Sequence, residues 1–140
     1  MKKLFMLVFI LGISQFGFAS DHGNNIKVET VAKTTKSWDG TTLPHYIKGQ
    51  PEVTILKITI PPHTKLAWHK HTVINAGILL KGHLTVKSET NKVLNLKAGD
   101  SIVELVETYH YGVNDYDEPA VIVVFYAGEK GKPITLLKQK

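Results

Sequence analysis

Short apolar segments, each closed by turn-forming residues, dominate the chain from residue 52 to residue 127. The segment 52–60 (EVTILKITI) has the alternation of a β-strand, and two consecutive prolines end it. Comparable segments of four to eight residues follow at 65–71, 74–80, 83–88, 92–96, 101–106, 110–113 and 120–127. A helical apolar period persists nowhere for three turns. Many short strands with turns between them predict an all-β sandwich or barrel.

The chain has 140 residues and no cysteine. This length favours one domain, and the missing cysteines exclude disulfides, thiolate metal sites and thiol nucleophiles. The roughly 120 residues that follow a cleaved leader are enough to bury an apolar core. We predict a leader at 1–19, a lead-in at 20–49, a barrel at 50–127 and a tail at 128–140. The lead-in is expected to contain an edge strand near 29–37.

The first 19 residues have the pattern of a secretory signal peptide. Two lysines precede an apolar run at 4–13, and GFA at 17–19 offers small residues at the cleavage positions. The run is too short to span a bilayer. We therefore expect a periplasmic or secreted protein that begins at Ser20, with no membrane segment after cleavage. An uncleaved N-terminal anchor is the alternative.

The charge of the chain is mildly basic. Removal of the predicted leader leaves 15 lysines, no arginine and 12 acidic residues, a net charge of +3. The lysines are spread along the sequence, and arginine is the residue best suited to bidentate contacts with bases and phosphates. We therefore expect a solvated lysine-rich surface and no nucleic-acid partner.

Two histidines stand two positions apart in a segment that has a strand pattern. Successive side chains of a strand point to opposite faces, so His69 and His71 share one face and Lys70 takes the other. Two imidazoles on one face can both bind a single metal ion. A third histidine, His110, lies far along the chain, where a closed β-fold can bring it to the same point.

The spacing around the histidine pair resembles the first motif of the cupin family of small double-stranded β-helix, or jelly-roll, barrels. That motif is Gly, five residues, His-x-His, three or four residues, Glu, six residues and Gly. Here His63, His69, His71, Asn75 and Gly82 keep the spacing. His63 replaces the usual glycine, and Asn75 replaces the usual metal-binding glutamate.

The spacing around His110 resembles the second cupin motif, which is Gly, five residues, Pro-x-Gly, two residues, His, three residues and Asn. Gly99, His110 and Asn114 keep the spacing, whereas Leu105 and Glu107 replace the proline and glycine of the central turn. The resemblance covers roughly residues 50–127. It implies a double-stranded β-helix (jelly-roll) barrel, and since the family commonly forms dimers, we expect a homodimer.

Carried over position by position, the resemblance gives His69, His71 and His110 as ligands of a divalent transition metal, with Asn75 in the carboxylate's place. The ion is Fe, Zn, Ni, Cu or Mn. Asn75 brings no charge, so we expect weaker affinity for oxygen-preferring ions such as Mn²⁺ and a stronger Lewis acid. Asn75 either ligates through its carbonyl oxygen or orients a bound water or substrate. An empty polar pocket lined by histidines is the alternative.

Other polar and aromatic side chains near these motifs are further candidates for the site or its surroundings. Glu104 stands in an apolar strand, where it either faces the pocket as a general acid/base with a raised pKa or lies at a water-facing edge. Glu107 is expected to be solvated. Tyr109 and Tyr111 fall on the face opposite His110. We expect Phe125 and Tyr126 to form core and barrel wall.

Three functions are compatible with these residues. The first is an exported metal-dependent enzyme, an oxygenase or isomerase of the cupin type, with dioxygenase-like or Lewis-acid chemistry on a small molecule. A three-histidine oxygenase is preferred within this class because of the resemblance alone. The second is a non-catalytic periplasmic cupin that binds a small molecule or a metal. The third is a structural or regulatory cupin without an ion.

Overall fold

The computed structural model describes residues 26–139, which contain strands, turns and loops and no α-helix. The predicted leader therefore lies outside the described residues. Within this range no helix has the length and apolar character that a membrane span needs. The strands are β1 (Pro51–Ile60), β2 (Thr64–Lys65), β3 (His69–His71), β4 (Asn75–Lys81), β5 (His83–Ser88), β6 (Val93–Lys97), β7 (Ser101–Val103), β8 (His110–Asn114), β9 (Ala120–Glu129) and β10 (Thr135–Leu137).

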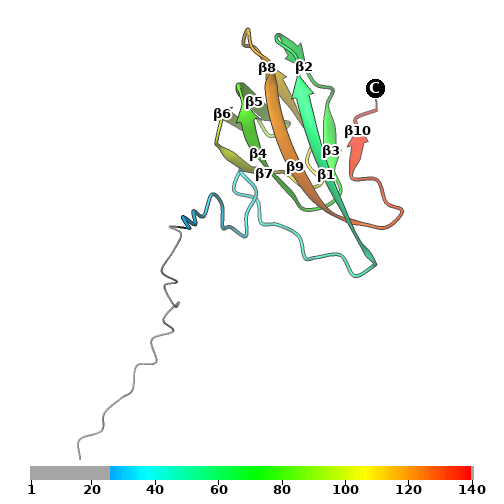
Figure 1. Ribbon diagram of the computed structural model, residues 1–140. Coiled ribbons are helices and arrows are strands. Elements are labelled where there is room, and N and C mark those ends of the chain that lie inside the picture. Colours follow the sequence, from blue (N-terminus) through cyan, green and yellow to red (C-terminus); the bar gives the residue numbers. More distant parts are fainter. Residues whose placement is uncertain (1–25, 140) are drawn as a thin grey trace, which may run out of the picture.

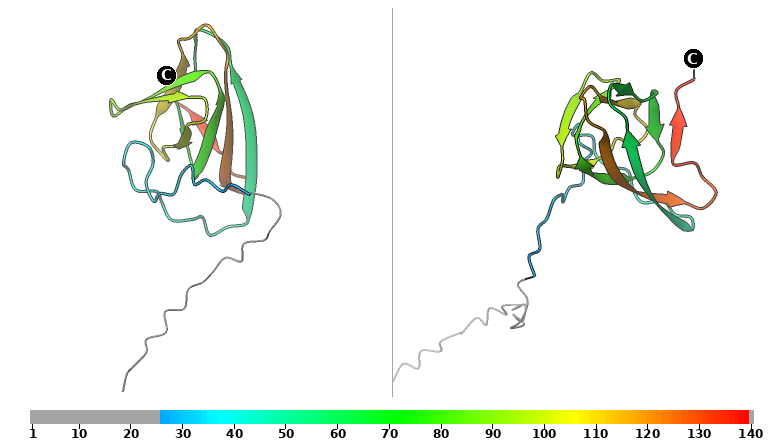
Figure 2. Two further views of the ribbon diagram at one scale, coloured as in Figure 1. Left: turned by 60° about the vertical axis from the view of Figure 1, so that its left-hand side comes forward. Right: turned by 45° about the horizontal axis from the view of Figure 1, so that its top comes forward.

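The strands form two sheets that face one another (Figures 1 and 2). One sheet has the order β1-β9-β4-β7 and the other the order β10-β3-β8-β5-β6, with β2 also paired to β8. The named strand pairs are antiparallel. This arrangement confirms the predicted all-β, double-stranded β-helix fold.

The core lies between the two sheets. It is made of alternate residues along the strands, those whose side chains point inward. In β9, Ala120, Ile122, Val124 and Tyr126 are buried. The facing sheet contributes buried leucine and valine side chains, among them Leu84, Val86 and Leu96. The period-2 pattern of the sequence thus places one face of each strand inside the barrel.

Three predictions about where the strands lie are corrected by the structure. The edge strand expected near 29–37 does not form, because this part of the chain folds into a tight turn in which Ser37 N–H donates to Thr41 O at 2.8 Å. Only an isolated bridge joins Lys36 to Thr42. The segment 65–71 is divided into β2 and β3, and the tail expected at 128–140 contains β10, which pairs with β3.

Backbone conformation explains the two positions at which glycines of the cupin motifs are replaced. His63 has φ 51° and Glu107 has φ 59°, both in the left-handed region that favours glycine. The chain therefore keeps the turns of the motifs with other residues in them. A non-glycine residue in this region costs about 1–2 kcal/mol, which the surrounding fold offsets.

Candidate metal centre

Three imidazoles meet at one end of the barrel interior. His69 and His71 come from β3, and His110 begins β8, where it is paired with His69. One nitrogen of each ring lies within 4.8 Å of the other two. His71 and His110 are only 4 % and 1 % exposed. The strand register thus gathers three potential ligands into a nearly dry corner, as the sequence led us to expect.

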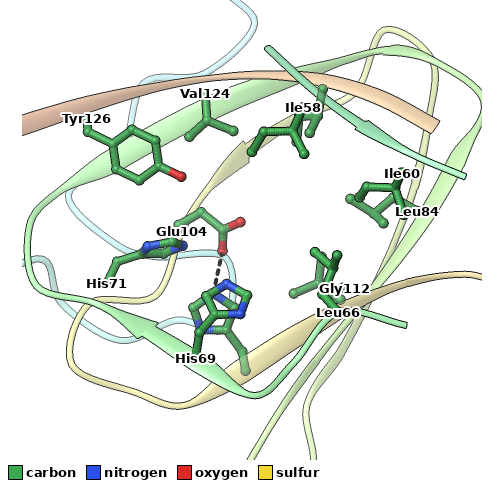
Figure 3. A pocket seen from close by; sticks show the side chains of 13 residues that line it. Ile58, Ile60, Leu66, His69, His71, Leu84, Glu104, Gly112, Val124 and Tyr126 are labelled. Atoms are coloured by element: carbon green, nitrogen blue, oxygen red, sulfur yellow. Dashed lines mark ion pairs between the residues drawn. The ribbon is translucent and has the colours of Figure 1, made fainter. Parts of the chain in front are cut away.

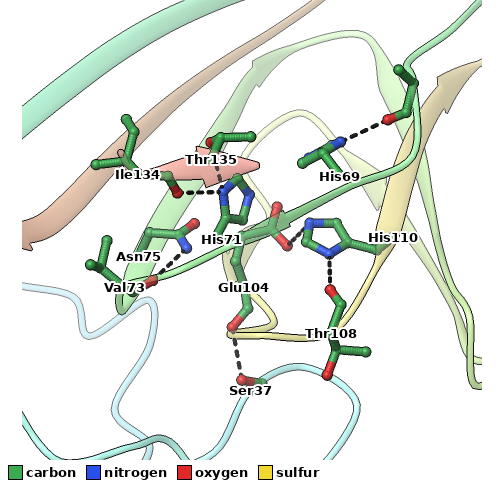
Figure 4. A network of polar contacts seen from close by, with 11 residues as sticks. Ser37, His69, His71, Val73, Asn75, Glu104, Thr108, His110, Ile134 and Thr135 are labelled. Carbon is green, nitrogen blue, oxygen red and sulfur yellow. Dashed lines mark hydrogen bonds and ion pairs between the residues drawn. The ribbon is translucent and has the colours of Figure 1, made fainter. Parts of the chain in front are cut away.

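Each imidazole is held by a hydrogen bond to its Nδ1 atom (Figure 4). The partners are Ala67 O for His69 at 2.8 Å, Thr108 O for His110 at 2.9 Å, and Thr135 Oγ1 for His71 at 3.0 Å. A carbonyl oxygen only accepts, so we assign the proton of His69 and His110 to Nδ1. Their Nε2 atoms are then free to bind a metal, as in known histidine–metal sites.

Burial and mutual repulsion keep the three histidines neutral. Burial is the main cause that lowers the pKa of each ring, and for His71 the neighbouring His110 and His69 add to it, lowering the pKa to about 3. Neutral imidazole is the form that coordinates metal ions. The corner therefore presents ligands in the correct protonation state at pH 7.

Glu104 faces this corner from the loop after β7. Its Oε2 atom lies 3.5 Å from His110 Nε2 (Figure 4). Its backbone is fixed on two sides, because Glu104 N–H donates to Asn75 O at 3.0 Å and Ser37 Oγ donates to Glu104 O at 2.8 Å. Burial raises the pKa of the Glu104 carboxyl to about 7. Of the two predicted orientations of Glu104, the structure has the one that faces the pocket.

The contact between Glu104 and His110 provides a test of whether the corner fits a cation. Neither Glu104 Oε2 nor His110 Nε2 has a hydrogen-bond partner among the described residues, although both are buried. With the proton of His110 on Nδ1, an ionised Glu104 would place two acceptor atoms against each other. A cation or a proton between them removes this conflict. Three imidazole nitrogens and a carboxylate oxygen are ligands that suit a divalent transition metal.

Asn75 is fully buried at the start of β4. Its Nδ2 donates to Val73 O at 3.1 Å, and its Oδ1 has no hydrogen-bond partner among the described residues. Since its own backbone oxygen accepts from Glu104 N–H, the asparagine and the glutamate are neighbours on paired segments. A carboxyl group, that of Glu104, therefore lies on the segment paired with position 75 and faces His110.

Glu107, Tyr109 and Tyr111 lie away from the three histidines. Glu107 is exposed and forms an ion pair with Lys70, in agreement with its predicted solvation. Tyr111 packs edge-to-face on Trp68, with ring centroids 4.6 Å apart. Tyr109 lies beneath the ammonium group of Lys138, 4.8 Å from the ring centroid. Neither tyrosine lines the cavity described next.

A cavity of about 60 Å³ opens from the three histidines into the barrel (Figure 3). Tyr126 lines it, and its ring centroid lies 5.3 Å from that of His71. Burial and the charge of Glu104 raise the pKa of Tyr126 to about 12, so its hydroxyl stays protonated. The sequence predicts that Phe125 and Tyr126 form core and barrel wall; Tyr126 is buried in the core, whereas Phe125 is exposed. The in-phase spacing of Tyr126 with the buried Ile122 and Val124 was the signal that it points inward.

The model of a family described as "Cupin domain" matches residues 56–126. No curated protein matches the chain.

Similar solved structures have the same fold at low sequence identity. An uncharacterised protein with a double-stranded β-helix domain from Klebsiella pneumoniae aligns with a TM-score of 0.54 and 20% identity over 69% of this chain and 90% of its own. The DMSP lyase DddQ from Ruegeria pomeroyi aligns with a TM-score of 0.55 and 19% identity over 61% of this chain and 43% of its own. Oxalate decarboxylase from Bacillus subtilis, described with Mn(II) centres, aligns with a TM-score of 0.54 and 18% identity over 61% and 23%. The alignments span less than half of the lyase and the decarboxylase.

Proposed function

Because this chain belongs to the cupin domain family, we propose that it binds one divalent transition-metal ion through His69, His71 and His110 and uses it on a small molecule. The observation that carries the proposal is the group of three imidazoles from β3 and β8, whose ligand nitrogens lie within 4.8 Å of one another in a corner where His71 and His110 are buried. Neutral imidazole nitrogens gathered at one buried point are a donor set that suits a divalent transition metal.

In this proposal Glu104 provides the carboxylate that the cupin motif usually has at position 75. Ligands on adjacent coordination positions of a transition metal are about 3 Å apart when each bond is about 2.1 Å. Glu104 Oε2 lies 3.5 Å from His110 Nε2, but only the ligand nitrogens of the three histidines form a group within 4.8 Å of one another, so Glu104 has to turn toward His69 and His71 to share their ion. Asn75 has a buried Oδ1 without a partner among the described residues, but it does not line the cavity, so the proposal does not make it a ligand of the ion.

The bound ion supplies Lewis-acid chemistry if it is zinc, and redox chemistry if it is iron, copper, nickel or manganese. The chain's own residues hold the ion in neutral imidazoles, surround it with apolar walls that limit water, and keep a protonated Tyr126 hydroxyl in the same cavity. The predicted leader, if cleaved, delivers this centre to the periplasm or the medium. A dioxygenase-like or Lewis-acid enzyme is the function that we propose.

Metal analysis of the purified, untagged protein tests the proposal. We expect about one equivalent of a transition metal by ICP-MS in the wild type after reconstitution with Fe²⁺, Zn²⁺, Cu²⁺, Ni²⁺ or Mn²⁺. His71→Ala should lose this metal, whereas His45→Ala, which removes an exposed histidine, should keep it. Equal metal content in His71→Ala and His45→Ala would contradict the proposal. Stoichiometric metal without turnover on small molecules would favour the non-catalytic binding function instead.

A further inference from the structure

The cavity at the three histidines has one polar end and one apolar end (Figure 3). The histidines, Glu104 and Tyr126 form the polar end. The other end is walled by aliphatic side chains, among them Ile58, Ile60, Leu66 and Leu84. Any ligand that reaches the metal corner therefore lays the rest of its surface against hydrocarbon.

The cavity is small. A single water needs about 10–15 Å³ of such space, so about 60 Å³ holds roughly four to six water-sized groups, one of which is the ion. An apolar cavity that holds benzene measures about 150 Å³. An aromatic ring is thus too large for the enclosed part of this site.

Charge sets a further limit on the ligand. Among residues 26–139, no lysine lines the cavity, and Glu104 is the only acidic residue that does. The sequence contains no arginine. A second charged group on a ligand would therefore be buried at the apolar end without a partner, which is strongly unfavourable.

From these three observations, and on the basis of the proposed metal function, we infer that the substrate is a small aliphatic molecule of about five non-hydrogen atoms or fewer. It has one metal-binding head group and an uncharged apolar body. Aromatic acids and dicarboxylates are excluded as substrates.

Binding of simple carboxylates to the Co²⁺-loaded protein tests this inference, because the visible spectrum of Co²⁺ reports ligand binding whether or not turnover occurs. The probes are formate, acetate and propanoate, with malonate and benzoate as the comparison for charge and size. We expect about fourfold tighter binding for each added methylene from formate to propanoate, the increment for burying one CH₂ group. Malonate and benzoate should each bind more weakly than propanoate.

Two variants change the apolar end without touching a metal ligand. A Cβ at Gly112 would meet Leu84 Cδ1 at 3.3 Å and Leu66 Cδ1 at 3.5 Å, so Gly112→Ala adds a methyl group between these side chains. We expect it to bring propanoate down to the affinity of acetate or below. Ile122→Val removes a methyl group from the same lining and should extend the increment to butanoate.

The outcomes separate this inference from the proposed function. If the wild type does not bind Co²⁺, both the proposed function and this inference are wrong. Normal Co²⁺ binding with no gain from formate to propanoate, or with malonate or benzoate binding more tightly than propanoate, would overturn the inference alone. An unchanged propanoate affinity in Gly112→Ala, with its Co²⁺ content intact, would also overturn it.

Discussion

At the scale of single residues, the chemistry of the site depends on whether a proton or a metal ion lies between the Glu104 carboxyl group and the His110 ring. Their facing atoms are 3.5 Å apart and buried. Without a cation the carboxyl is kept partly protonated, since burial raises its pKa to about 7. A bound ion would replace this proton and turn Glu104 into a carboxylate, so metal binding should release a proton near neutral pH.

Replacing Glu104 with glutamine keeps the shape of the side chain and removes its charge. We expect Glu104→Gln to weaken divalent metal binding at least tenfold, because even partners of metal ligands contribute that much. The matched control is Glu107→Gln, which changes an exposed glutamate paired with Lys70. Competition titration with a metal indicator measures both. Equal losses in the two variants would rule out a specific role for Glu104.

The pH dependence of stability in the metal-free protein also reports on this pair. The pKa values of His69, His71 and His110 are lowered in the folded state, so the unfolded chain binds more protons and stability falls as the pH drops below about 6.5. Glu104 acts in the opposite direction between the ordinary pKa of a glutamate, 4.5, and its folded-state pKa of about 7, because the folded state holds the extra proton.

Glu104→Gln removes this opposing contribution. Urea unfolding in the presence of a chelator, from pH 7.5 to pH 5, should therefore show a steeper loss of stability in the variant. The slope of the free energy of unfolding against pH should differ from that of the wild type by at most the slope of one bound proton. Parallel curves for the wild type and Glu104→Gln would show that Glu104 titrates alike in the folded and unfolded chains.

The residues of the site differ in how far the sequence could predict them. His69 and His71 follow from strand alternation alone, because the period of two is local. For Glu104 the sequence allows both a pocket-facing and a water-facing orientation. The orientation depends on the hydrogen bonds of the Glu104 backbone with Asn75 and Ser37. Those contacts join segments 29 and 67 positions apart in the chain, which local patterns do not contain.

At the scale of elements, the turn around Ser37 and strand β10 support the site from outside the region matched by the family model. Ser37 is buried and donates to Glu104 O, and Trp38 N–H donates to Val103 O at 2.9 Å. On the other side, Thr135 in β10 contacts His71 Nδ1. Elements at both ends of the chain thus hold the polypeptide that carries the candidate ligands.

Removing the Ser37 hydroxyl should leave the buried Glu104 carbonyl with one donor fewer. We expect Ser37→Ala to lower the free energy of unfolding by about 1–3 kcal/mol. Ser101→Ala is the control, because Ser101 Oγ makes an equally short bond of 2.8 Å to Val31 O, but in an exposed place. Its cost should be about 0.5 kcal/mol or less. Chemical denaturation measures both, and equal costs would contradict the structural role of Ser37.

The lead-in also shows where element prediction failed. The Thr/Lys/Val-rich segment near 29–37 has strand composition, yet it folds against β7 through the turn at Ser37 instead of joining a sheet edge. The break between β2 and β3 falls at residues 66–68 (LAW), which contain no glycine, proline or other turn residue, so the local sequence does not indicate it. The turn before His110 keeps its backbone conformation with Glu107 in place of glycine, and only the structure reveals this.

At the scale of the whole molecule, the barrel is the device that brings distant residues together. His69 and His110 are neighbours in the register of β3 and β8, and the second sheet closes the cavity with β1 and β9. Composition and turn spacing predicted the all-β class, and family resemblance predicted the position of His110. The chain pattern alone has no information about which strands pair across the barrel.

Strands β3 and β8, which carry the three histidines, are part of the barrel. Metal binding should therefore stabilise the entire domain. A ligand that binds only the folded state adds about 2.7 kcal/mol when its concentration is 100 times the Kd. We expect the metal-free wild type to gain about this much in thermal unfolding when metal is added and to lose it when a chelator follows. His71→Ala should show no such gain. A gain of the same size in His71→Ala would indicate binding elsewhere.

X-ray absorption spectroscopy of the Co²⁺-loaded protein tests the central claim most directly, because it counts the ligands of the bound ion. The proposed centre predicts three imidazole nitrogens, recognised by their outer-shell scattering, together with at least one oxygen. A spectrum with one imidazole or none would show that the ion binds outside the corner formed by His69, His71 and His110.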